Sequence, residues 1–292
     1  MSGVRIVPRT AGELVARYGG RLRGDVPSDV VRLASVEHAR RGDLTFLLSP
    51  RFRDDAVHAA ARGALLVIDE SLAQRSELAS LSGLLHAHAP WLMAELLQLA
   101  ESPPPEPHIG AGCTIGQGAQ LLPGVVLGDR VSIGPGTIVG APGFGFVRSP
   151  SGALQPIPHR GGVVIDDDVH VGPLCSIAAG TLGPTRIGRG VKLDALVHVA
   201  HNCEIGAGTV IAAQSGLAGS VIVGAGVRIG GQVGIADHVR IGDGASLAAK
   251  SGVISDVPRG ATFAGYPAVE RTRWLRGLAM LYRSLERRRP RH

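Results

Sequence analysis

Three histidines stand out in a chain that is otherwise rich in small aliphatic residues. His198 and His201 lie three residues apart in the segment KLDALVHVAHNCEIG, and His238 follows 37 residues after His201 (238 − 201). An imidazole has an ordinary pKa near ~6.5, so an outward-facing histidine in a groove can accept a proton near neutral pH. His201 is therefore a candidate general base, and the alternative is a histidine that only packs.

The same three histidines also admit a metal-binding interpretation. Catalytic zinc sites commonly combine three protein ligands, often imidazoles, with one open position. Asp194 and Asp237 would then be the carboxylates that orient the ligand rings. This interpretation predicts a zinc-dependent lyase, whereas base catalysis by His201 needs no metal.

The elements that carry these residues follow a six-residue period. Aliphatic residues recur at every sixth position without a break from Ile187 to Val253, and shorter series run over 109–133 and 165–177. This period is that of hexapeptide repeats, in which three repeats form one triangular coil. We therefore expect a mainly β protein, a left-handed parallel β-helix with aliphatic side chains inside. Two coils of 18 residues plus one separate His201 from His238, which places them on neighbouring edges.

The cysteines follow the same repeat. Cys113, Cys175 and Cys203 each lie four residues after an aliphatic position of the series, where a second small residue points inward. Their number is odd, and they lack the paired spacing of a zinc finger or a redox motif. We expect them to be reduced and to fill the core.

The period fails between Val139 and Ile165. The intervening GAPGFGFVRSPSGALQPIPHRGG carries Phe144 and Phe146, and we expect residues 140–163 to form an excursion loop that serves as a binding wall. The predicted organisation is a small α/β domain over 1–101, a proline-rich linker over 102–107, the solenoid over 108–262 and a helical extension over 263–292.

Charge and hydropathy restrict the partners. The formal net charge is +6, and nearly all of the basic charge is arginine. A helix predicted over 268–289 carries arginines on one face, which would steer an acidic protein partner. The basic residues are not interleaved with aromatics, so nucleic-acid binding is not predicted. No apolar stretch approaches the roughly 20 residues that span a bilayer, so we expect a soluble, cytoplasmic protein without a transmembrane segment.

Several segments occur in an order that resembles one family. After the GFGF loop come AHN at 200–202, IAAQSGLAGS at 211–220, IGGQVGIADH at 229–238, GYPA at 265–268 and the basic helix. This succession resembles the UDP-3-O-acylglucosamine N-acyltransferases of lipid A biosynthesis over almost the whole chain. The resemblance implies a homotrimer that transfers an (R)-3-hydroxyacyl chain from acyl carrier protein to the 2-amine of UDP-3-O-acylglucosamine, without a metal or other cofactor.

The resemblance also implies roles for individual residues. His201 matches the general base, His238 a second groove histidine near the thioester oxygen, and Gly219 the backbone amide that binds this oxygen. The domain over 1–101 is implied to bind the uridine nucleotide. Residues implied in substrate binding are Phe46, Ser49, Phe52, His198, Asp194, Phe144, Phe146 and Lys250. Residues implied in contact with acyl carrier protein are Arg271, Arg273, Arg276 and Arg283.

Some positions depart from the family's pattern. Ala178-Ala179-Gly180 replaces an Asp-Arg-Gly segment, and His198 stands where the family usually has Gln. These changes affect sugar-nucleotide recognition more than acyl transfer. The alternatives are therefore a divergent paralogue that acylates another amino sugar nucleotide, a zinc-dependent lyase of the γ-carbonic-anhydrase type, and a non-catalytic trimeric scaffold.

Overall fold

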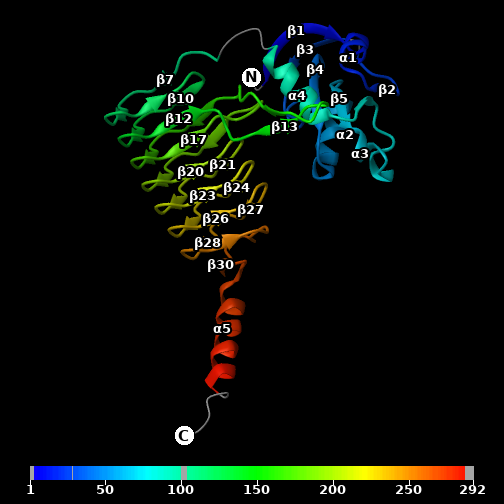
Figure 1. Ribbon diagram of the computed structural model, residues 1–292. Coiled ribbons are helices and arrows are strands. Elements are labelled where there is room, and N and C mark those ends of the chain that lie inside the picture. The colour runs from blue at the N-terminus through cyan, green and yellow to red at the C-terminus, as the bar shows by residue number, and fades with distance from the viewer. Residues whose placement is uncertain (1–2, 28, 100–103, 287–292) are drawn as a thin grey trace. The chain divides into compact units, whose positions relative to one another are not determined.

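The computed structural model describes residues 3–27, 29–99 and 104–286 (Figure 1). It divides the chain into two compact units. The N-terminal unit comprises residues 1–105, 142–162 and 180–184, and the solenoid unit comprises residues 106–141, 163–179 and 185–292. The excursion was expected within the solenoid domain, whereas its residues 142–162 pack within the N-terminal unit. Of the proline-rich linker, residues 102 and 103 lie outside the described residues.

The N-terminal unit is built from a six-stranded sheet, a two-stranded hairpin and short helices. Its strands are β1 (Val4–Thr10), β2 (Arg21–Arg23), β3 (Asp29–Leu33), β4 (Asp43–Leu47), β5 (Leu65–Asp69), β6 (Gly83–His86), β13 (Phe146–Arg148) and β14 (Leu154–Pro156). Its helices are α1 (Ala11–Tyr18), η1 (Pro50–Phe52), α2 (Arg53–Ala61), α3 (Glu70–Ala73), η2 (Ser76–Leu78) and α4 (Ala89–Gln98).

The six-stranded sheet has helices on both faces. Its strand order is β1-β3-β4-β5-β6-β2, with β3 to β6 parallel and the two outer strands antiparallel to their neighbours. Alternate residues of β4 enter opposite cores, because successive side chains of a strand point to opposite faces. Phe46 joins the core under α1 and α4, and Leu47 joins the core under α2. The result is an α/β/α sandwich, whose parallel strands end at one common edge.

The solenoid unit consists of three parallel sheets. The first contains β7 (His108–Ile109), β10 (Val125–Leu127), β15 (Val163–Ile165), β18 (Thr185–Ile187), β21 (Glu204–Ile205), β24 (Ile222–Val223) and β27 (Arg240–Ile241). The second contains β8 (Thr114–Ile115), β11 (Ser132–Ile133), β16 (His170–Val171), β19 (Lys192–Leu193), β22 (Val210–Ile211), β25 (Arg228–Ile229), β28 (Ser246–Leu247), β30 (Thr262–Gly265) and β31 (Ala268–Glu270). The third contains β9 (Gln120–Leu121), β12 (Ile138–Ala141), β17 (Ser176–Ala178), β20 (His198–Val199), β23 (Gly216–Leu217), β26 (Gly234–Ile235) and β29 (Gly252–Val253).

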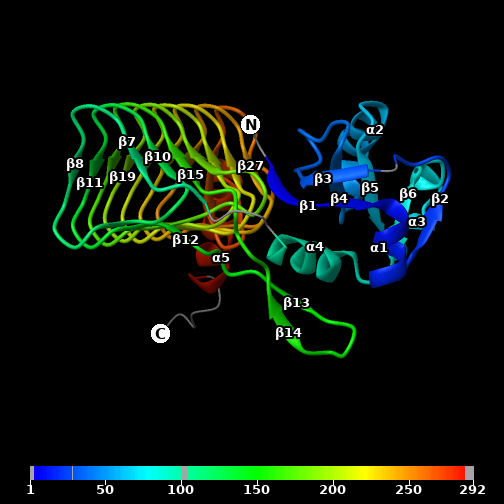
Figure 2. The same cartoon turned by 90° about the horizontal axis from the view of Figure 1, so that it is seen from above.

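These sheets form the predicted left-handed parallel β-helix. Figure 2 shows the coils stacked one behind another, and the second residue of most two-residue strands is a buried aliphatic of the six-residue series. Cys175 and Cys203 are buried in the same core, and none of the three cysteines is in a disulfide. The first coil is different: Ile109 and Ile115 were expected inside, yet they are 48% and 40% exposed. Among the described residues no coil of the solenoid precedes this first one, so no described part of the repeat covers its open side.

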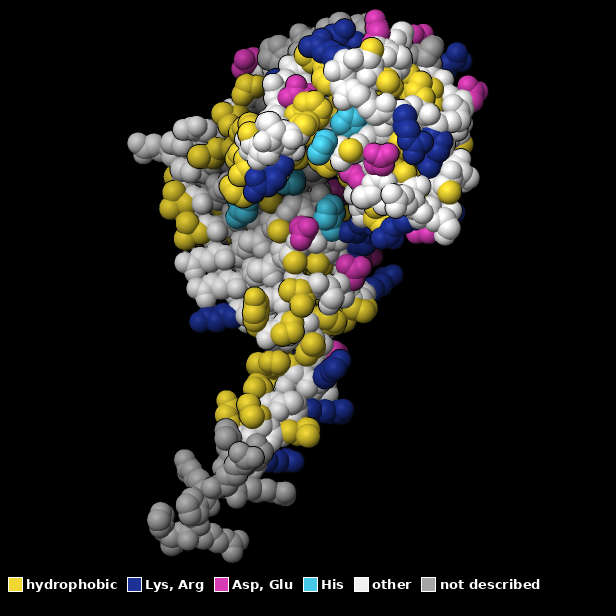
Figure 3. All heavy atoms as spheres, turned by 45° about the vertical axis from the view of Figure 1, so that its right-hand side comes forward, with side chains coloured by type: hydrophobic (Ala, Val, Ile, Leu, Met, Phe, Trp, Pro, Cys, Tyr) yellow, Lys and Arg dark blue, Asp and Glu magenta, His cyan; other side chains and the backbone are white. Residues whose placement is uncertain are grey.

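The solenoid ends in a short hairpin and one helix. Residues 268–270 were expected to be helical, but they form β31, which pairs antiparallel with β30 through the turn at Tyr266-Pro267. The helix α5 (Arg271–Glu286) begins only after this hairpin and contacts both of its strands. Apolar side chains line one side of α5 and basic side chains the other (Figure 3). In the part of the chain that the structure describes, no helix is long and apolar enough to cross a membrane.

Candidate active site

His201 lies in the turn that leads from β20 to β21, and the same turn recurs on the next two coils, from β23 to β24 and from β26 to β27. One coil later the equivalent residue is Gly219, and the next residues of successive turns are Asn202, Ser220 and His238, all with a left-handed φ of 59–60°. The Ser220 amide donates to the His201 carbonyl over 2.9 Å, and the His238 amide donates to the Gly219 carbonyl over 3.0 Å. We call this column of stacked turns the histidine corner.

The histidine corner corrects the expected position of His238. His201 and His238 were predicted on neighbouring edges, but both lie in turns from the third sheet to the first. The prediction was wrong because each turn spans several residues, so an offset of one residue stays within the same corner. Adjacent strands of a sheet lie about 4.8 Å apart, so two coils correspond to an axial separation of about 10 Å. Positive charge on His238 acts on His201, so the two rings are electrostatically coupled.

The imidazole of His201 has a partner beside it in the chain. The side-chain amide of Asn202 lies 3.0 Å from Nδ1 of His201. The amide nitrogen Nδ2 of Asn202 is the atom that faces the ring, so it donates to Nδ1 and the ring proton lies on Nε2. The backbone amide of Asn202 in turn donates to Oγ1 of Thr185 over 3.0 Å. The neighbouring Asn202 therefore orients the ring and selects its tautomer. Asn202 was not among the predicted site residues, although the AHN segment contains it.

Gly219 provides both space and a hydrogen-bond donor for chemistry at His201. A Cβ at this position would lie 2.6 Å from Cε1 and 2.9 Å from Nε2 of His201, so the ring sits directly against the glycine. The amides at the matching turn positions Ala213 and Ala225 donate to Asp194 and Asp243. Within the described residues, no hydrogen bond uses the Gly219 amide. Gly219, which lies against the His201 ring, therefore has an N–H group that no hydrogen bond among the described residues uses.

Electrostatics keep His201 in its neutral form. Burial lowers the pKa of its imidazole below the ordinary value of 6.5, and positive charge on His238 and then His198 lowers this pKa further. Burial also lowers the pKa of His198. The neutral imidazole is the form that accepts a proton.

His198 stands on strand β20, just before the histidine corner. Its neighbours in register on adjacent coils are Ser176 and Gly216, both small, so the outward-facing imidazole has no large neighbour along the sheet. This position makes His198 part of the electrostatic surroundings of His201.

The pH dependence of kcat/KM for acyl transfer tests this coupling. The rate should fall as pH drops through the lowered pKa of His201, because only the neutral ring accepts a proton, so the acidic limb lies below pH 6.5. His198→Gln removes one of the charges that lower this pKa, so the limb should move to higher pH. His170→Gln, an exposed histidine on β16 of another sheet, serves as the control. An unchanged limb in His198→Gln would contradict the coupling.

Two other predicted substrate residues of the solenoid lie elsewhere. Asp194 and Lys250 occupy turns from the second sheet to the third, a different corner from that of His201. The carboxylate of Asp194 accepts the amides of Ala195 over 2.7 Å and Ala213 over 3.2 Å, so it ties the turns of two coils together.

The predicted residues of the N-terminal unit do not form one cluster. Phe46 is only 7% exposed and belongs to the core under α1 and α4, whereas Phe52 packs against the core on the other face of the sheet. Ser49 precedes the short helix η1. Phe144 and Phe146 are exposed and make an edge-to-face contact with ring centroids 5.2 Å apart.

The four arginines predicted to contact a carrier protein are all exposed on α5: Arg271, Arg273, Arg276 and Arg283. The metal-binding alternative requires a group of ligands. Among the described residues, no three His, Cys, Asp or Glu side chains are grouped so as to hold a metal ion.

Several known proteins are similar to this chain in sequence and fold. The family model described as "Bacterial transferase hexapeptide (six repeats)" matches residues 106–141 and 184–219. A protein of Anaeromyxobacter dehalogenans named UDP-3-O-acylglucosamine N-acyltransferase is 34% identical to this chain over an alignment of 327 residues. The alignment covers 93% of this chain and 91% of the relative. The chain belongs to the UDP-3-O-acylglucosamine N-acyltransferase family.

Other members of the family match over a shorter span. A relative of the same name from Aromatoleum aromaticum is 34% identical over 222 residues, which cover 60% of this chain and 65% of the relative. Among solved structures, a UDP-N-acetylglucosamine acyltransferase from Campylobacter jejuni is 30% identical with a TM-score of 0.52, covering 57% of this chain and 63% of that one. This match supports the β-helix fold.

Proposed function

We propose that the protein is an N-acyltransferase of lipid A biosynthesis. It transfers an (R)-3-hydroxyacyl chain from acyl carrier protein to the 2-amino group of UDP-3-O-acylglucosamine. The observation that carries this proposal is the contact between the His201 ring and Gly219, which places a base and an unused amide donor side by side. The names of the chain's relatives supply the acceptor.

The reaction that we propose needs no covalent enzyme intermediate. The amine nitrogen attacks the thioester carbon, and negative charge develops on the carbonyl oxygen. The Gly219 amide donates to this oxygen, and such donors act strongly because they are already oriented. The His201 imidazole takes a proton from the attacking nitrogen. The C–S bond then breaks, His201 returns the proton to the leaving thiolate, and the products are an amide and a free thiol.

Direct assay of transfer tests the proposal. The purified protein is incubated with 3-hydroxyacyl carrier protein and UDP-3-O-acylglucosamine, and we expect the sugar nucleotide to gain one acyl chain while one thiol is released. UDP-N-acetylglucosamine, whose 2-nitrogen is already acylated, is the control acceptor. A folded protein that acylates neither UDP-3-O-acylglucosamine nor other amino sugar nucleotides would refute the proposal.

Acyl carrier protein is the proposed donor partner, and α5 is its proposed contact. The double charge reversal of Arg276 and Arg283 to Glu should raise KM for the carrier-protein donor about tenfold at low salt, because exposed charges steer an acidic partner. The value of kcat should stay the same. Arg228→Glu, on strand β25, is the matched control. An unchanged KM in the double variant would place the carrier protein elsewhere.

We also propose that the protein acts as a homotrimer in the cytoplasm. Exposed apolar residues support self-association: Leu174 and Leu196 are 60% and 47% exposed, and both have a left-handed φ that bulky residues rarely adopt. The apolar side of α5, which includes Leu281 and Tyr282, is also exposed. Burial of these side chains between copies would remove them from water.

A further inference from the structure

The buried thiol of Cys203 lies beneath the turn that carries Gly219. Cys203 is fully buried in the core of the solenoid. Its Sγ donates to the carbonyl oxygen of Ala218 over 3.1 Å, and no other group among the described residues donates to this oxygen. A residue that only fills a core needs no such bond, so the contact indicates a second role for Cys203.

This carbonyl and the Gly219 amide belong to one peptide group. A peptide group is planar and almost always trans, so its C=O and its N–H point in opposite directions. The carbonyl of Ala218 points into the core, where the thiol lies. The Gly219 N–H therefore points outward, and the His201 ring lies against the same glycine. The bond to Cys203 thus fixes the direction of the amide next to the base.

Two other coils show that a hydroxyl can make the same bond. Oγ1 of Thr209 donates to the Gly224 carbonyl, and Oγ of Ser215 donates to the Gly230 carbonyl, each over 2.8 Å. Donor and acceptor are 15 residues apart in both pairs, as they are for Cys203. A serine at position 203 should therefore reach the same carbonyl as the cysteine does.

The histidine corner can form without a donor at this position. One coil after Cys203, the buried Val221 takes its place, and the turn that follows still has a left-handed residue, His238. The hydrogen bond from Cys203 is therefore not a requirement of the repeat. It belongs to the turn that contains Gly219, where the direction of an amide matters for the chemistry.

A turn that lacks the donor can close on itself. Val227 is buried at the same inward position of another corner, and in the turn that it supports the Ala245 amide donates to the Gly242 carbonyl over 3.2 Å. In the turn of Gly219, no backbone amide of the described residues donates to the Ala218 carbonyl. Without the thiol, this carbonyl would turn toward the amide across the turn, and the Gly219 N–H would tilt with it.

The thiol keeps the proton that this bond requires. Burial raises the pKa of Cys203 to about 12, and backbone amides of the neighbouring turns lower it only in part. A free thiol has a pKa of about 8.5. The buried thiol therefore remains a donor throughout the neutral pH range.

We propose that Cys203 is a positioning residue for acyl transfer: its thiol holds the Ala218 carbonyl inward and thereby directs the Gly219 N–H at the oxygen on which negative charge develops. Donors that are already oriented stabilise such charge strongly, because they need no reorganisation during the reaction. Cys203 acts through the peptide group, since its own side chain is buried. The inference rests on the proposed function, in which the Gly219 amide binds the thioester oxygen.

Two substitutions at position 203 isolate the hydrogen bond. Cys203→Ala and Cys203→Ser leave side chains of similar size, but only serine can donate. Cys203→Ala should lower kcat for acyl transfer about tenfold at unchanged KM. This loss is smaller than the ~10²–10³-fold effect of deleting an oxyanion donor, because the amide is still present. Cys203→Ser should keep kcat within about threefold of the parental value. Initial rates of the full-length protein over a range of substrate concentrations give both constants.

Cys175→Ala is the matched control. Cys175 is buried, and its Sγ donates to the Asp194 carbonyl over 3.0 Å at a different corner of the solenoid. Its substitution removes the same kind of bond and the same volume from the core, so the Tm of both alanine variants should fall by a similar amount. The kcat of Cys175→Ala should equal that of the parent.

The outcomes separate the positioning role from the proposed function. If Cys203→Ala transfers as fast as Cys175→Ala, or if Cys203→Ser loses as much kcat as Cys203→Ala, the positioning role is refuted while the transferase assignment stands. Cys203→Val keeps the core filled, as valine does one coil later, and should show the same loss as Cys203→Ala. A parental protein that transfers no acyl chain would refute the proposed function, and the positioning role with it.

Discussion

His201→Ala should reduce kcat for acyl transfer by about 10²–10⁴-fold, the range that general-base catalysis contributes. The variant loses the only group that we assign to proton removal, while the Gly219 amide and the surrounding turn remain. The acidic limb of the pH–rate profile should disappear together with the rate, because the titrating ring is gone. Initial rates of amide formation between pH 5 and pH 8, measured at saturating substrate, check both effects.

The control for this variant is His170→Ala, on the exposed surface of β16. Both proteins should unfold thermally like the parent, since substitutions of partly exposed side chains usually change stability little. A residual rate in His201→Ala within a factor of a few of the control would remove His201 from the mechanism. The scaffold alternative, which requires no base, would then become the better description.

The solenoid could be predicted from the sequence because its structure repeats at a fixed spacing along the chain. Each coil repeats the same contacts, so a six-residue period with inward aliphatics sets the register of every strand. The same register predicts that His201 points outward and Cys203 inward. In the structure His201 is partly exposed and Cys203 is buried. The repeat contains no information on what lies beyond its own end, which is why the exposure of Ile109 was not foreseen.

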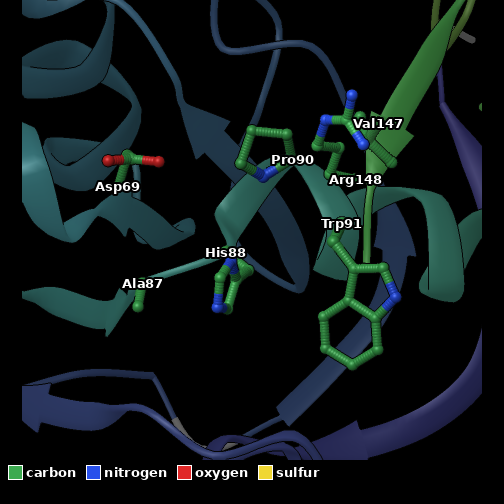
Figure 4. A pocket seen from close by; sticks show the side chains of 7 residues that line it. All are labelled: Asp69, Ala87, His88, Pro90, Trp91, Val147 and Arg148. Carbon is green, nitrogen blue, oxygen red and sulfur yellow. The ribbon is translucent and has the colours of Figure 1, made fainter. Parts of the chain in front are cut away.

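Features that depend on contacts between different kinds of element were harder to predict. The excursion packs within the N-terminal unit through the bond between Trp91 and Gln155, residues 64 positions apart with no shared pattern. A pocket of the N-terminal unit, lined by residues that include Asp69, His88, Trp91 and Arg148 (Figure 4), was missed for the same reason, because its residues come from the ends of two strands, a helix and a hairpin. The family resemblance implied a substrate contact at Phe46, but the side chain of this residue points from β4 into the hydrophobic core.

Gly219→Ala tests the second half of the proposed chemistry, the close contact between base and amide. A methyl group at this position would lie 2.6 Å from Cε1 of His201, closer than a Cβ contact allows, so the ring has to move. A base displaced by about 1 Å loses its alignment, and such misplacement can cost about 100-fold in rate. We expect a loss of this size in kcat, with thermal stability changed little, because the His201 ring rather than the backbone absorbs the shift.

Gly231→Ala is the matched control for this substitution. Gly231 occupies the same position of the turn at another corner, where a Cβ would have its nearest contact at 3.3 Å and where Ala213 and Ala249 fill the position on adjacent coils. This variant should therefore keep the parental rate. Equal rates for the two alanine variants would mean that His201 moves aside without losing function, and the tight packing against Gly219 would then have no part in catalysis. A loss confined to Gly219→Ala would tie the rate to the placement of the ring, because the two substitutions add the same methyl group to the same kind of turn.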